Sequence, residues 1–263
     1  MSDFKPTDPA AQPGSTGGGF LELPRFNAVV VGNGAIGTAI LERLLALPAL
    51  EHGFLLARRP GGAPGDSRVS SLYVDAEQPQ SIADAAANVS RQVERIHLLF
   101  NTVGMLHADG QRPEKRLRDL DPDQLQRSFA INATFLPLLC QAFSPLLKHP
   151  QPAVLASLSA RVGSIEDNGL GGWYSYRAAK AAHNMLLRTL SREWKISHRN
   201  VSLVALHPGT VESRLSAPFI SASYRNRVLS PDESAAALLA VIAQLTPGRT
   251  GDFHDWQGEP IPW

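Results

Sequence analysis

The sequence predicts an α/β fold, a doubly wound parallel sheet of about seven strands flanked by helices in a single domain. Short apolar runs alternate with helical patterns along the chain, and this order places the strands parallel and side by side. The first run begins at Phe26 and leads through a glycine-rich turn into a helical pattern that stops at Pro48. Chemically distinctive residues then recur where the runs end, at the edge where such sheets bind ligands.

The composition favours one domain that acts on small molecules. The chain of 263 residues can form one large α/β domain over residues 25–263, while residues 1–24 carry few large apolar groups and are expected to form a flexible tail. Its 25 basic and 24 acidic residues leave a formal charge of +1, which attracts neither nucleic acid nor a membrane surface. We therefore expect no nucleic-acid partner and no membrane partner.

The numbers and positions of cysteine and histidine residues indicate the cellular compartment and the prospects for metal binding. The single cysteine, Cys140, excludes an internal disulfide and fits a reducing compartment. No apolar run approaches the roughly 20 residues that span a bilayer, and the N-terminus lacks a basic and then apolar signal segment. The eight histidines are scattered along the chain, so no metal site is expected. The cytoplasm is the expected location.

The turn after the first strand has the spacing of a dinucleotide site. Its six residues are Gly32, Asn33, Gly34, Ala35, Ile36 and Gly37. This G-x-G-x-x-G spacing lets the backbone approach a pyrophosphate, whose charge the amide groups at the helix N-terminus satisfy. The alternative is a tight turn between strand and helix with no ligand. We favour the Rossmann-like dinucleotide site.

Two arginines, Arg58 and Arg59, follow the second predicted strand about twenty residues beyond the last glycine. A site for NAD places a carboxylate there on the ribose 2′-hydroxyl, whereas the nearest acids, Glu51 and Asp66, stand at the far ends of the strand and loop. A guanidinium group suits a 2′-phosphate instead. The sequence thus favours NADP(H) over NAD(H), with two solvated arginines that open a loop as the alternative.

Tyr176 and Lys180 are the leading candidates for catalysis. They lie four residues apart in an alanine-rich run that favours helix, so their side chains leave the same face and can serve one reacting group. Tyr174 is the competing tyrosine, but Ala178 stands four residues after it and supplies no cation. The Y-x-x-x-K pattern by itself is a short motif of low specificity.

Three features combined resemble the short-chain dehydrogenase/reductase family: the Y-x-x-x-K pattern, a serine-bearing strand upstream and the glycine-rich turn. The match runs from about Phe26 to the C-terminus, and the segments LSARVGSI and GGWYSYRAAKAAHN further resemble the C-factor-like branch. The family usually spaces its glycines T-G-x-x-x-G-x-G, whereas Val31 precedes Gly32 here and Ala35 stands in the penultimate glycine's place. The resemblance implies an NADP(H)-dependent enzyme that reduces an aldehyde or ketone to an alcohol, or runs the reverse reaction, as a homodimer or homotetramer.

The resemblance also implies roles in catalysis. Tyr176 would act as general acid and base, and Lys180 would favour the tyrosinate and bind the cofactor ribose. Asn132 interrupts a long apolar helix that is predicted to start at Asp121. The family uses an asparagine at this place to hold a water that leads to the lysine, and a backbone clamp is the alternative.

The catalytic serine has three candidates. Ser157 and Ser159 share one face of a predicted strand. In the family this serine is usually followed by two residues and a glycine, but counting back from Gly163 gives Ala160. We favour Ser159, because a bulge or a longer turn would restore its direction, with Ser157 and Ser164 as alternatives.

Further cofactor contacts follow from the resemblance, near the ends of other strands. They are Asp75, Asn101, Val103, Gly104, Pro208, Gly209, Val211 and Ser213. Residues 215–227 are expected to form a mobile lid with Phe219 and Tyr224 as candidate substrate contacts, and Ser230 and Glu233 then predict a capping box. The competing hypothesis is a dinucleotide-binding sensor or signalling protein with little catalytic activity. The displaced serine favours that hypothesis, and the retained tyrosine, lysine and asparagine oppose it.

Overall fold

Seven parallel strands form the central sheet of the computed structural model, which describes residues 19–60, 65–108, 112–220, 224–247 and 249–263. The strand order is β3-β2-β1-β4-β5-β6-β9, and each neighbouring pair is parallel. The strands are β1 (Phe26–Val31), β2 (Leu50–Ala57), β3 (Val69–Tyr73), β4 (Leu98–Asn101), β5 (Ala153–Leu158), β6 (Val201–His207) and β9 (Asp252–Asp255). The predicted fold class is confirmed.

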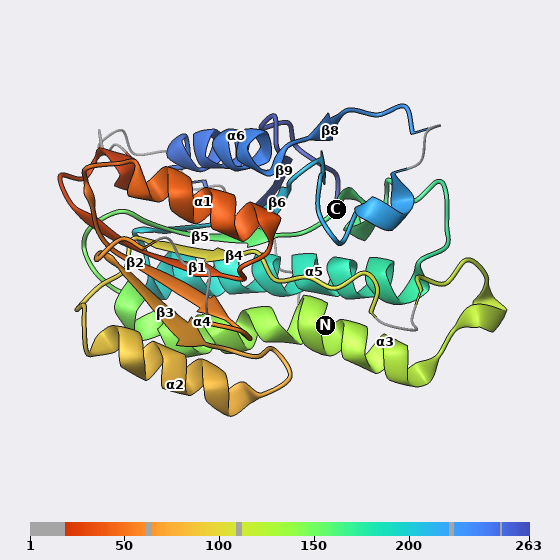
Figure 1. Cartoon of the computed structure of the whole chain (residues 1–263), viewed down its shortest axis with the longest axis horizontal. Coiled ribbons are helices and arrows are strands. Elements are labelled where there is room, and N and C mark those ends of the chain that lie inside the picture. The colour runs from red at the N-terminus through yellow and green to blue at the C-terminus, as the bar shows by residue number, and fades with distance from the viewer. Residues whose placement is uncertain (1–18, 61–64, 109–111, 221–223, 248) are drawn as a thin grey trace, which may run out of the picture.

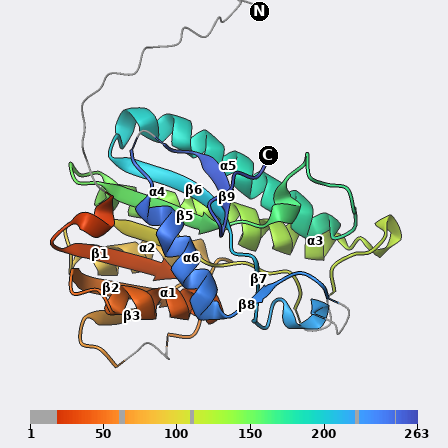
Figure 2. The same ribbon diagram turned by 90° about the horizontal axis from the view of Figure 1, so that it is seen from above.

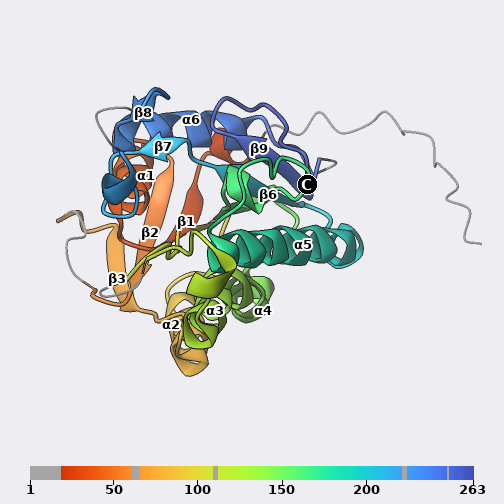
Figure 3. The same cartoon turned by 90° about the vertical axis from the view of Figure 1, so that its right-hand side faces the viewer.

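Helices cover both faces of this sheet (Figures 1 and 3). Helices α1 and α6 pack together on one face (Figure 2), and α2, α4 and α5 cover the other. Their bounds are α1 (Ala35–Leu45), α2 (Pro79–Ser90), α3 (Pro122–Phe129), α4 (Phe135–Leu147), α5 (Tyr174–Ser197) and α6 (Pro231–Ala243). The strand order reverses between β1 and β4, and ligands of doubly wound sheets bind at the carboxyl ends of the strands beside that point.

Both faces of the sheet are buried, so its central strands are continuously apolar rather than alternating. All six residues of β1 are buried. Val29 and Val31 belong to the core cluster under α2, α4 and α5, whereas Ala28 and Val30 belong to the cluster under α1 and α6. Successive side chains of the strand point to opposite faces of the sheet and so belong to two different cores. The packing of both cores fixes the positions of the carboxyl ends of the strands.

The folded domain begins before residue 25, where the sequence predicts its start. Phe20 lies in a 3-10 turn, η1 (Phe20–Glu22), and its fully buried ring packs edge-on against Phe26 at a centroid distance of 5.5 Å. Burial of the apolar surface of this one aromatic ring holds the chain against the domain. The rest of the expected tail, residues 1–18, lies outside the described residues.

The long apolar helix expected around Asn132 consists of three elements. Helix α3 starts as predicted at the Asp121 side chain, which accepts a hydrogen bond of 2.8 Å from the Gln124 amide. A π-helical turn, η3 (Ala130–Thr134), then separates α3 from α4. π turns are rare and occur often at functional sites, so this interruption marks Asn132 as a residue of interest.

The combined helix over Pro122–Leu147 corrects the expectation that no segment reaches membrane length. Its 26 residues contain a window with a mean hydropathy of 1.4, which by length and composition alone is enough to cross a membrane. More than half of that window is buried inside the protein, because its apolar side chains pack against the sheet. Core helices of globular proteins pass the same test, and the lack of a membrane partner stays a prediction.

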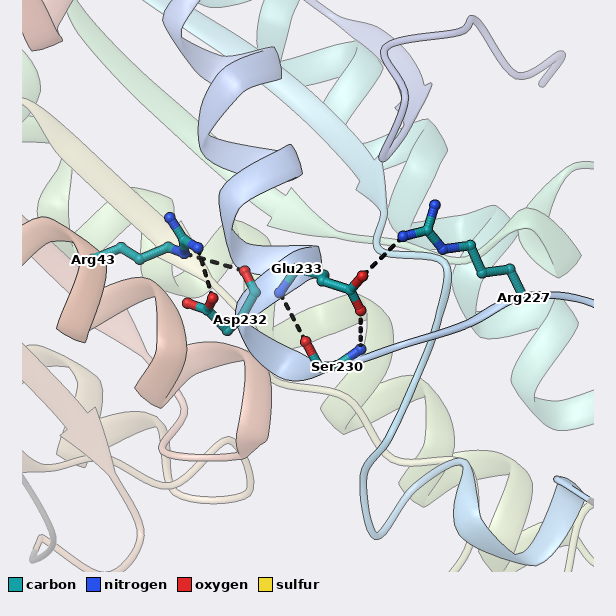
Figure 4. Close-up of polar contacts among 5 residues, drawn as sticks. All are labelled: Arg43, Arg227, Ser230, Asp232 and Glu233. Carbon is teal, nitrogen blue, oxygen red and sulfur yellow. Dashed lines mark hydrogen bonds and ion pairs between the residues drawn. The ribbon is translucent and has the colours of Figure 1, made fainter.

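The predicted capping box of α6 is confirmed (Figure 4). Ser230 Oγ accepts a hydrogen bond of 3.1 Å from the Glu233 amide, and the Glu233 carboxylate accepts one of 2.8 Å from the Ser230 amide. Arg227 pairs with Glu233 at 2.8 Å, and Arg43 of α1 pairs with Asp232 at 2.7 Å. These contacts tie the start of α6 to α1 and to the segment before it.

Candidate active site

Helix α5 carries Tyr176 and Lys180 as buried neighbours, as their spacing predicts. Tyr176 is 8 % exposed and Lys180 is 2 % exposed, and the Lys180 Nζ atom lies 5.8 Å from the centre of the Tyr176 ring. Burial lowers the pKa of Lys180 to about 7 and raises the pKa of Tyr176. The phenol is therefore protonated near neutral pH, while the amine can gain or lose a proton there.

Lys180, Asn132 and Gly104 meet beside the end of β5. Lys180 Nζ donates a hydrogen bond of 2.8 Å to the main-chain oxygen of Leu158. A Cβ atom at Gly104 would lie 3.5 Å from both Lys180 Nζ and Asn132 Oδ1. The ends of β4 and β5, the π turn and α5 thus converge on one small volume, and three residues predicted for the site share it.

Asn132 holds the loop after β4. Its Oδ1 atom accepts a hydrogen bond of 2.8 Å from the Met105 amide, and its Nδ2 atom donates to Met105 O at 2.8 Å and to Ser128 Oγ at 3.1 Å. The main-chain oxygen of Asn132 lies 3.1 Å from His183 Nδ1. The backbone clamp that the sequence leaves open is present, and the water-holding role stays a prediction.

All three candidate serines are buried and bonded to other residues of the protein. Ser159 Oγ donates to Asn184 Oδ1 at 2.6 Å, and Ser157 Oγ accepts a hydrogen bond of 3.0 Å from Asn101 Nδ2. Ser164 Oγ accepts one of 3.1 Å from the main-chain amide three residues along the chain. A serine hydroxyl has one hydrogen, so the bond to Asn184 leaves Ser159 none for a substrate oxygen in this arrangement.

Ala160, the position that the family spacing indicates for the serine, begins a 3-10 turn, η4 (Arg161–Gly163). This is the longer turn expected after Ser159. A Cβ atom at Gly163 would lie 2.8 Å from Lys180 Cβ, so this glycine lets the turn pack directly on α5. The turn thus joins α5 to the end of β5, and the assignment of Ser159 as the catalytic serine stays a prediction.

The glycine turn leaves open space at the start of α1. Gly32 has a φ of +104°, a Cβ atom there would lie 2.5 Å from Thr102 Oγ1, and one at Gly37 would clash with the Gly32 oxygen. The packing of the chain itself therefore requires both glycines. At Gly34 a Cβ atom would meet no atom of the described residues within 4 Å. This space in front of an uncapped helix N-terminus suits a pyrophosphate, so the turn fits the predicted cofactor.

Arg58 and Arg59 follow β2 at the carboxyl edge of the sheet, and both residues are exposed. Asn33 of the glycine turn donates a hydrogen bond of 3.1 Å to the main-chain oxygen of Arg59, which ties the two segments together. Asp75 follows β3 at the same edge, and its Oδ1 atom accepts a hydrogen bond of 3.0 Å from the Glu77 amide. The structure thus places three predicted cofactor residues at the same edge of the sheet as the glycine turn.

Two further segments with predicted cofactor contacts end at this edge. After β4, Asn101 Oδ1 accepts a hydrogen bond of 3.1 Å from the Val103 amide. After β6, Gly209 has a φ of +79°, and a Cβ atom there would lie 2.9 Å from Leu229 Cδ1. Val211 then pairs with Leu229 in a small separate sheet (Figure 2). Its two strands are β7 (Thr210–Val211) and β8 (Val228–Leu229).

An aromatic group lies beside Tyr176. The group consists of the side chains of His107, Trp173 and Phe219. Phe219 ends a 3-10 turn, η5 (Ala217–Phe219), and its ring centre lies 5.0 Å from that of Trp173 and 5.9 Å from that of His107. The Trp173 ring centre is 6.4 Å from that of Tyr176. A predicted lid residue therefore packs against the residue that precedes α5.

Hydrogen bonds connect described residues of the lid and of the segment after β6. The Tyr224 hydroxyl lies 2.5 Å from Thr210 Oγ1, so this predicted substrate contact is bonded to the segment after β6. Ser213 Oγ lies 3.1 Å from the hydroxyl of the serine three residues later, and the Pro208 oxygen accepts a hydrogen bond of 2.8 Å from a serine of α6. Residues 221–223 of the expected lid lie outside the described residues, and its mobility stays a prediction.

Glu114 is a buried carboxylate at the start of α5, and the sequence presents it as part of an ordinary polar loop. Glu114 is 2 % exposed, and its carboxylate accepts hydrogen bonds from the Ser175 amide at 3.3 Å and from the Ser175 hydroxyl. Its main-chain oxygen accepts a hydrogen bond of 2.5 Å from the Trp173 amide. Glu114 and Tyr176 also line one small cavity. Because no local pattern separates this acid from its exposed neighbours, only its burial reveals it.

Comparisons with known proteins agree with this fold. The family described as short chain dehydrogenase matches residues 27–223. The enzyme 1-hydroxy-2-glutathionyl-2-methyl-3-butene dehydrogenase from Rhodococcus sp. (strain AD45) is 33 % identical over 191 residues, which are 72 % of this chain and 78 % of that protein. C-signal from Myxococcus xanthus is 33 % identical over 147 residues, which are 56 % of this chain and 83 % of that protein.

Solved structures share the architecture. The NADPH-bound carbonyl reductase from chicken fatty liver superimposes with a TM-score of 0.80 at 28 % identity, over 92 % of this chain and all of that one. The carbonyl reductase Sniffer of D. melanogaster has a TM-score of 0.79 at 23 % identity, over 91 % of this chain and all of that one, and shows the fold alone. Since the family match spans most of the chain, the protein belongs to the short chain dehydrogenase family and is an oxidoreductase.

Proposed function

We propose that the protein is an NADP(H)-dependent oxidoreductase that reduces an aldehyde or ketone to an alcohol, or catalyses the reverse reaction. The observation that carries the proposal is the joint burial of Tyr176 and Lys180 beside Asn132, at the sheet edge where the glycine turn begins α1. The NADPH bound to the similar chicken carbonyl reductase supports the cofactor assignment.

The residues at the carboxyl edge form the proposed NADP(H) site. The amides of residues 32–37 would bind the pyrophosphate, and the guanidinium groups of Arg58 and Arg59 would bind the 2′-phosphate. The remaining proposed contacts are Asp75, Asn101, Val103, Gly104, Tyr176, Lys180, Pro208, Gly209, Val211 and Ser213. When bound, NADP(H) supplies or accepts the hydride.

Tyr176 is the proposed proton donor to the substrate oxygen during reduction. Burial raises the pKa of Tyr176, so the phenol holds its proton at neutral pH and can give it to an oxygen that gains negative charge. The ammonium of Lys180, near the ring, would stabilise the tyrosinate left behind. In the oxidation direction, the same tyrosinate would take the proton of the alcohol. Asn132 would help to return a proton to Lys180 and Tyr176 from solvent.

Replacing Tyr176 with phenylalanine tests this mechanism, because the change keeps the ring and removes only the hydroxyl. We expect turnover of aldehydes, ketones and quinones to fall by about 10²–10⁴-fold, with the Kd for NADPH within about twofold of the wild-type value. Loss of reduced cofactor, followed by absorbance, measures turnover. Full activity of Tyr176→Phe would discard the mechanism.

A dinucleotide-binding sensor or signalling protein is the second candidate function. The bonds that hold Ser157, Ser159 and Ser164 within the protein favour it, and the similarity to C-signal points the same way. Incubation of the wild type with NADPH and the carbonyl panel separates the two. Consumption of NADPH supports the reductase, whereas binding of NADPH without consumption supports the sensor.

We also propose that the protein is a cytoplasmic homodimer or homotetramer. Met185 and Ile196 lie on one face of α5, about three helical turns apart, and are 66 % and 76 % exposed. Exposed apolar side chains aligned in this way suit a subunit interface. Sedimentation velocity of the purified protein measures the assembly, and a monomer at micromolar concentration would contradict it.

A further inference from the structure

His183 is a buried imidazole one turn after Lys180 on α5. The spacing of four from Tyr176 to Lys180 and of three from Lys180 to His183 keeps all three side chains on one side of the helix. His183 is 1 % exposed. The proposed mechanism assigns it no role.

The imidazole is bonded to the π turn. His183 Nδ1 lies 3.1 Å from the main-chain oxygen of Asn132, which belongs to η3. Since a carbonyl oxygen only accepts hydrogen bonds, we assign the hydrogen to Nδ1 and a lone pair to Nε2. Nε2 is buried and has no hydrogen-bond partner in the described part of the chain. Burial and the nearby charge of Lys180 lower the pKa of His183 to about 3, so the ring is a neutral donor near neutral pH.

Asn132 is therefore held from two sides. Its side chain binds the amide and the oxygen of Met105 in the loop after β4, each at 2.8 Å, and its main chain binds His183 of α5. π turns are rare, and contacts from outside a helix are needed to favour one over a regular turn. His183 supplies such a contact from the catalytic helix.

The position of Asn132 sets the space around the Lys180 amine. A Cβ atom at Gly104 would lie 3.5 Å from Asn132 Oδ1 and 3.5 Å from Lys180 Nζ, so both groups border the same point. In catalytic sites, misplacement of a group by about 1 Å can cost about 100-fold in rate. A displaced main chain at Asn132 would thus change the surroundings of Lys180 and the loop after β4 together.

We propose that His183 is a positioning residue whose neutral imidazole holds the main chain at Asn132, so that the Asn132 amide, the loop after β4 and Lys180 keep the arrangement that Tyr176 needs. This inference rests on the proposed oxidoreductase function. Its consequence is a loss of turnover that exceeds any loss of cofactor affinity when the imidazole is removed.

Three variants of the full-length protein test the role of His183. His183→Leu removes the donor, and His183→Gln keeps a side-chain amide that can donate to the same carbonyl oxygen. His198→Leu is the matched control, because His198 is a second buried imidazole, at the other end of α5. Its Nε2 atom lies 3.0 Å from Ser144 Oγ, and its ring stacks on Trp194.

Steady-state kinetics with NADPH and a carbonyl compound that the wild type reduces provide the first readout. We expect His183→Leu to lower kcat about tenfold or more, with a smaller change in KM for NADPH, and His183→Gln to recover most of the loss. His198→Leu should keep its kcat and lose only thermal stability. A wild-type kcat in His183→Leu, or an equal loss of kcat in all three variants, would overturn the inference.

Hydrogen exchange provides a second readout that needs no turnover. The Met105 amide donates to Asn132 Oδ1, so we expect its exchange to speed up in His183→Leu and to stay unchanged in His183→Gln and His198→Leu. Unchanged exchange in His183→Leu would count against the contact, even if the wild type proves inactive. The expected exchange pattern in a protein with no turnover would instead refute the proposed function and support the contact.

Discussion

At the scale of single residues, the site combines ionisable side chains that are buried beside one another. Lys180 Nζ is bonded to a main-chain oxygen, and the pKa values of Lys180 and Tyr176 shift in opposite directions because burial disfavours the charged form of each. Such groups cost stability and are typical of sites where protons move. The geometry therefore supports the two side chains that the spacing in the sequence predicts for catalysis, and their catalytic roles stay predictions.

Ser159→Ala separates a structural role of this hydroxyl from a catalytic one. A structural role alone, through the bond to Asn184 Oδ1, predicts a loss of about 1 kcal/mol in unfolding free energy and a kcat within about threefold of wild type. Urea unfolding and steady-state kinetics measure the two effects. A fall in kcat of about 10²–10³-fold would instead assign the predicted catalytic role to Ser159. Ala160→Ser supplies a hydroxyl at the place that the family spacing indicates, and we expect it to raise kcat.

Arg58→Ala tests the preference for NADP(H). Loss of a charge-assisted bond to a 2′-phosphate costs about 1.5–3 kcal/mol, so kcat/KM for NADPH should fall about tenfold or more while kcat/KM for NADH stays nearly constant. Arg59→Ala shows whether the second guanidinium group also contributes to binding of the 2′-phosphate. Arg91→Ala changes an exposed arginine outside the proposed site and serves as the control. Equal losses with both cofactors would contradict the assignment.

At the scale of elements, the start of α5 is an unusual turn. Gly171 and Gly172 have φ values of +65° and +66°, and Trp173 follows with a φ of +52°, the one non-glycine residue with positive φ in the described ranges. A left-handed conformation costs a residue with a side chain about 1–2 kcal/mol. Glu114 offsets part of this cost, because its main chain bonds to Trp173 and its carboxylate bonds to Ser175.

Glu114→Ala removes the carboxylate that caps the catalytic helix. The variant leaves the Ser175 amide and hydroxyl without their acceptor, so we expect the unfolding free energy to fall by about 1–3 kcal/mol. We also expect kcat to fall, because Tyr176 directly follows Ser175 and would be displaced with it. Ser230→Ala is the matched control, since it removes the cap of α6 at a cost of about 1 kcal/mol and should leave kcat unchanged. A normal kcat in Glu114→Ala would show that the cap serves stability alone.

At the scale of the whole molecule, the buried amine of Lys180 makes stability depend on pH. The folded pKa is about 7 and the reference value is 10.5, so between about pH 7 and 10 the unfolded state binds more protons and stability rises with pH. The slope reaches about 1.4 kcal/mol per pH unit. Above pH 10 the raised pKa of Tyr176 acts in the opposite direction, because only the unfolded tyrosine then loses its proton.

Lys180→Met isolates this dependence, because methionine keeps the apolar stem without the amine. Urea unfolding at pH 7, 8 and 9 should show stability rising with pH in the wild type, and the rise should be smaller or absent in the variant. The difference between the two slopes removes the contribution of all other titrating groups. Equal slopes would show that the amine is charged in the folded protein throughout this range.

Local patterns are sufficient to predict the architecture and the joint burial of two candidate site residues on one helix. The alternation of apolar runs and helical patterns predicts the parallel sheet, and the spacing of Tyr176 and Lys180 places both on one buried helix. The capping box at Ser230 and the helix start at Asp121 were also readable, because a cap depends on residues three apart. The sequence pattern assigns Phe20 to the tail, because a single aromatic residue shows no periodicity, whereas the structure buries its ring against Phe26.

Residues close together in the chain suffice to predict the fold class, the glycine turn and the helix that carries Tyr176 and Lys180. Which polar groups meet becomes visible only in the folded protein, where the pairs are Ser159 with Asn184, Glu114 with Ser175, and His183 with Asn132. These pairs join segments far apart in sequence. A buried polar group must find a partner, and which one it finds depends on how the sheet and helices pack around it.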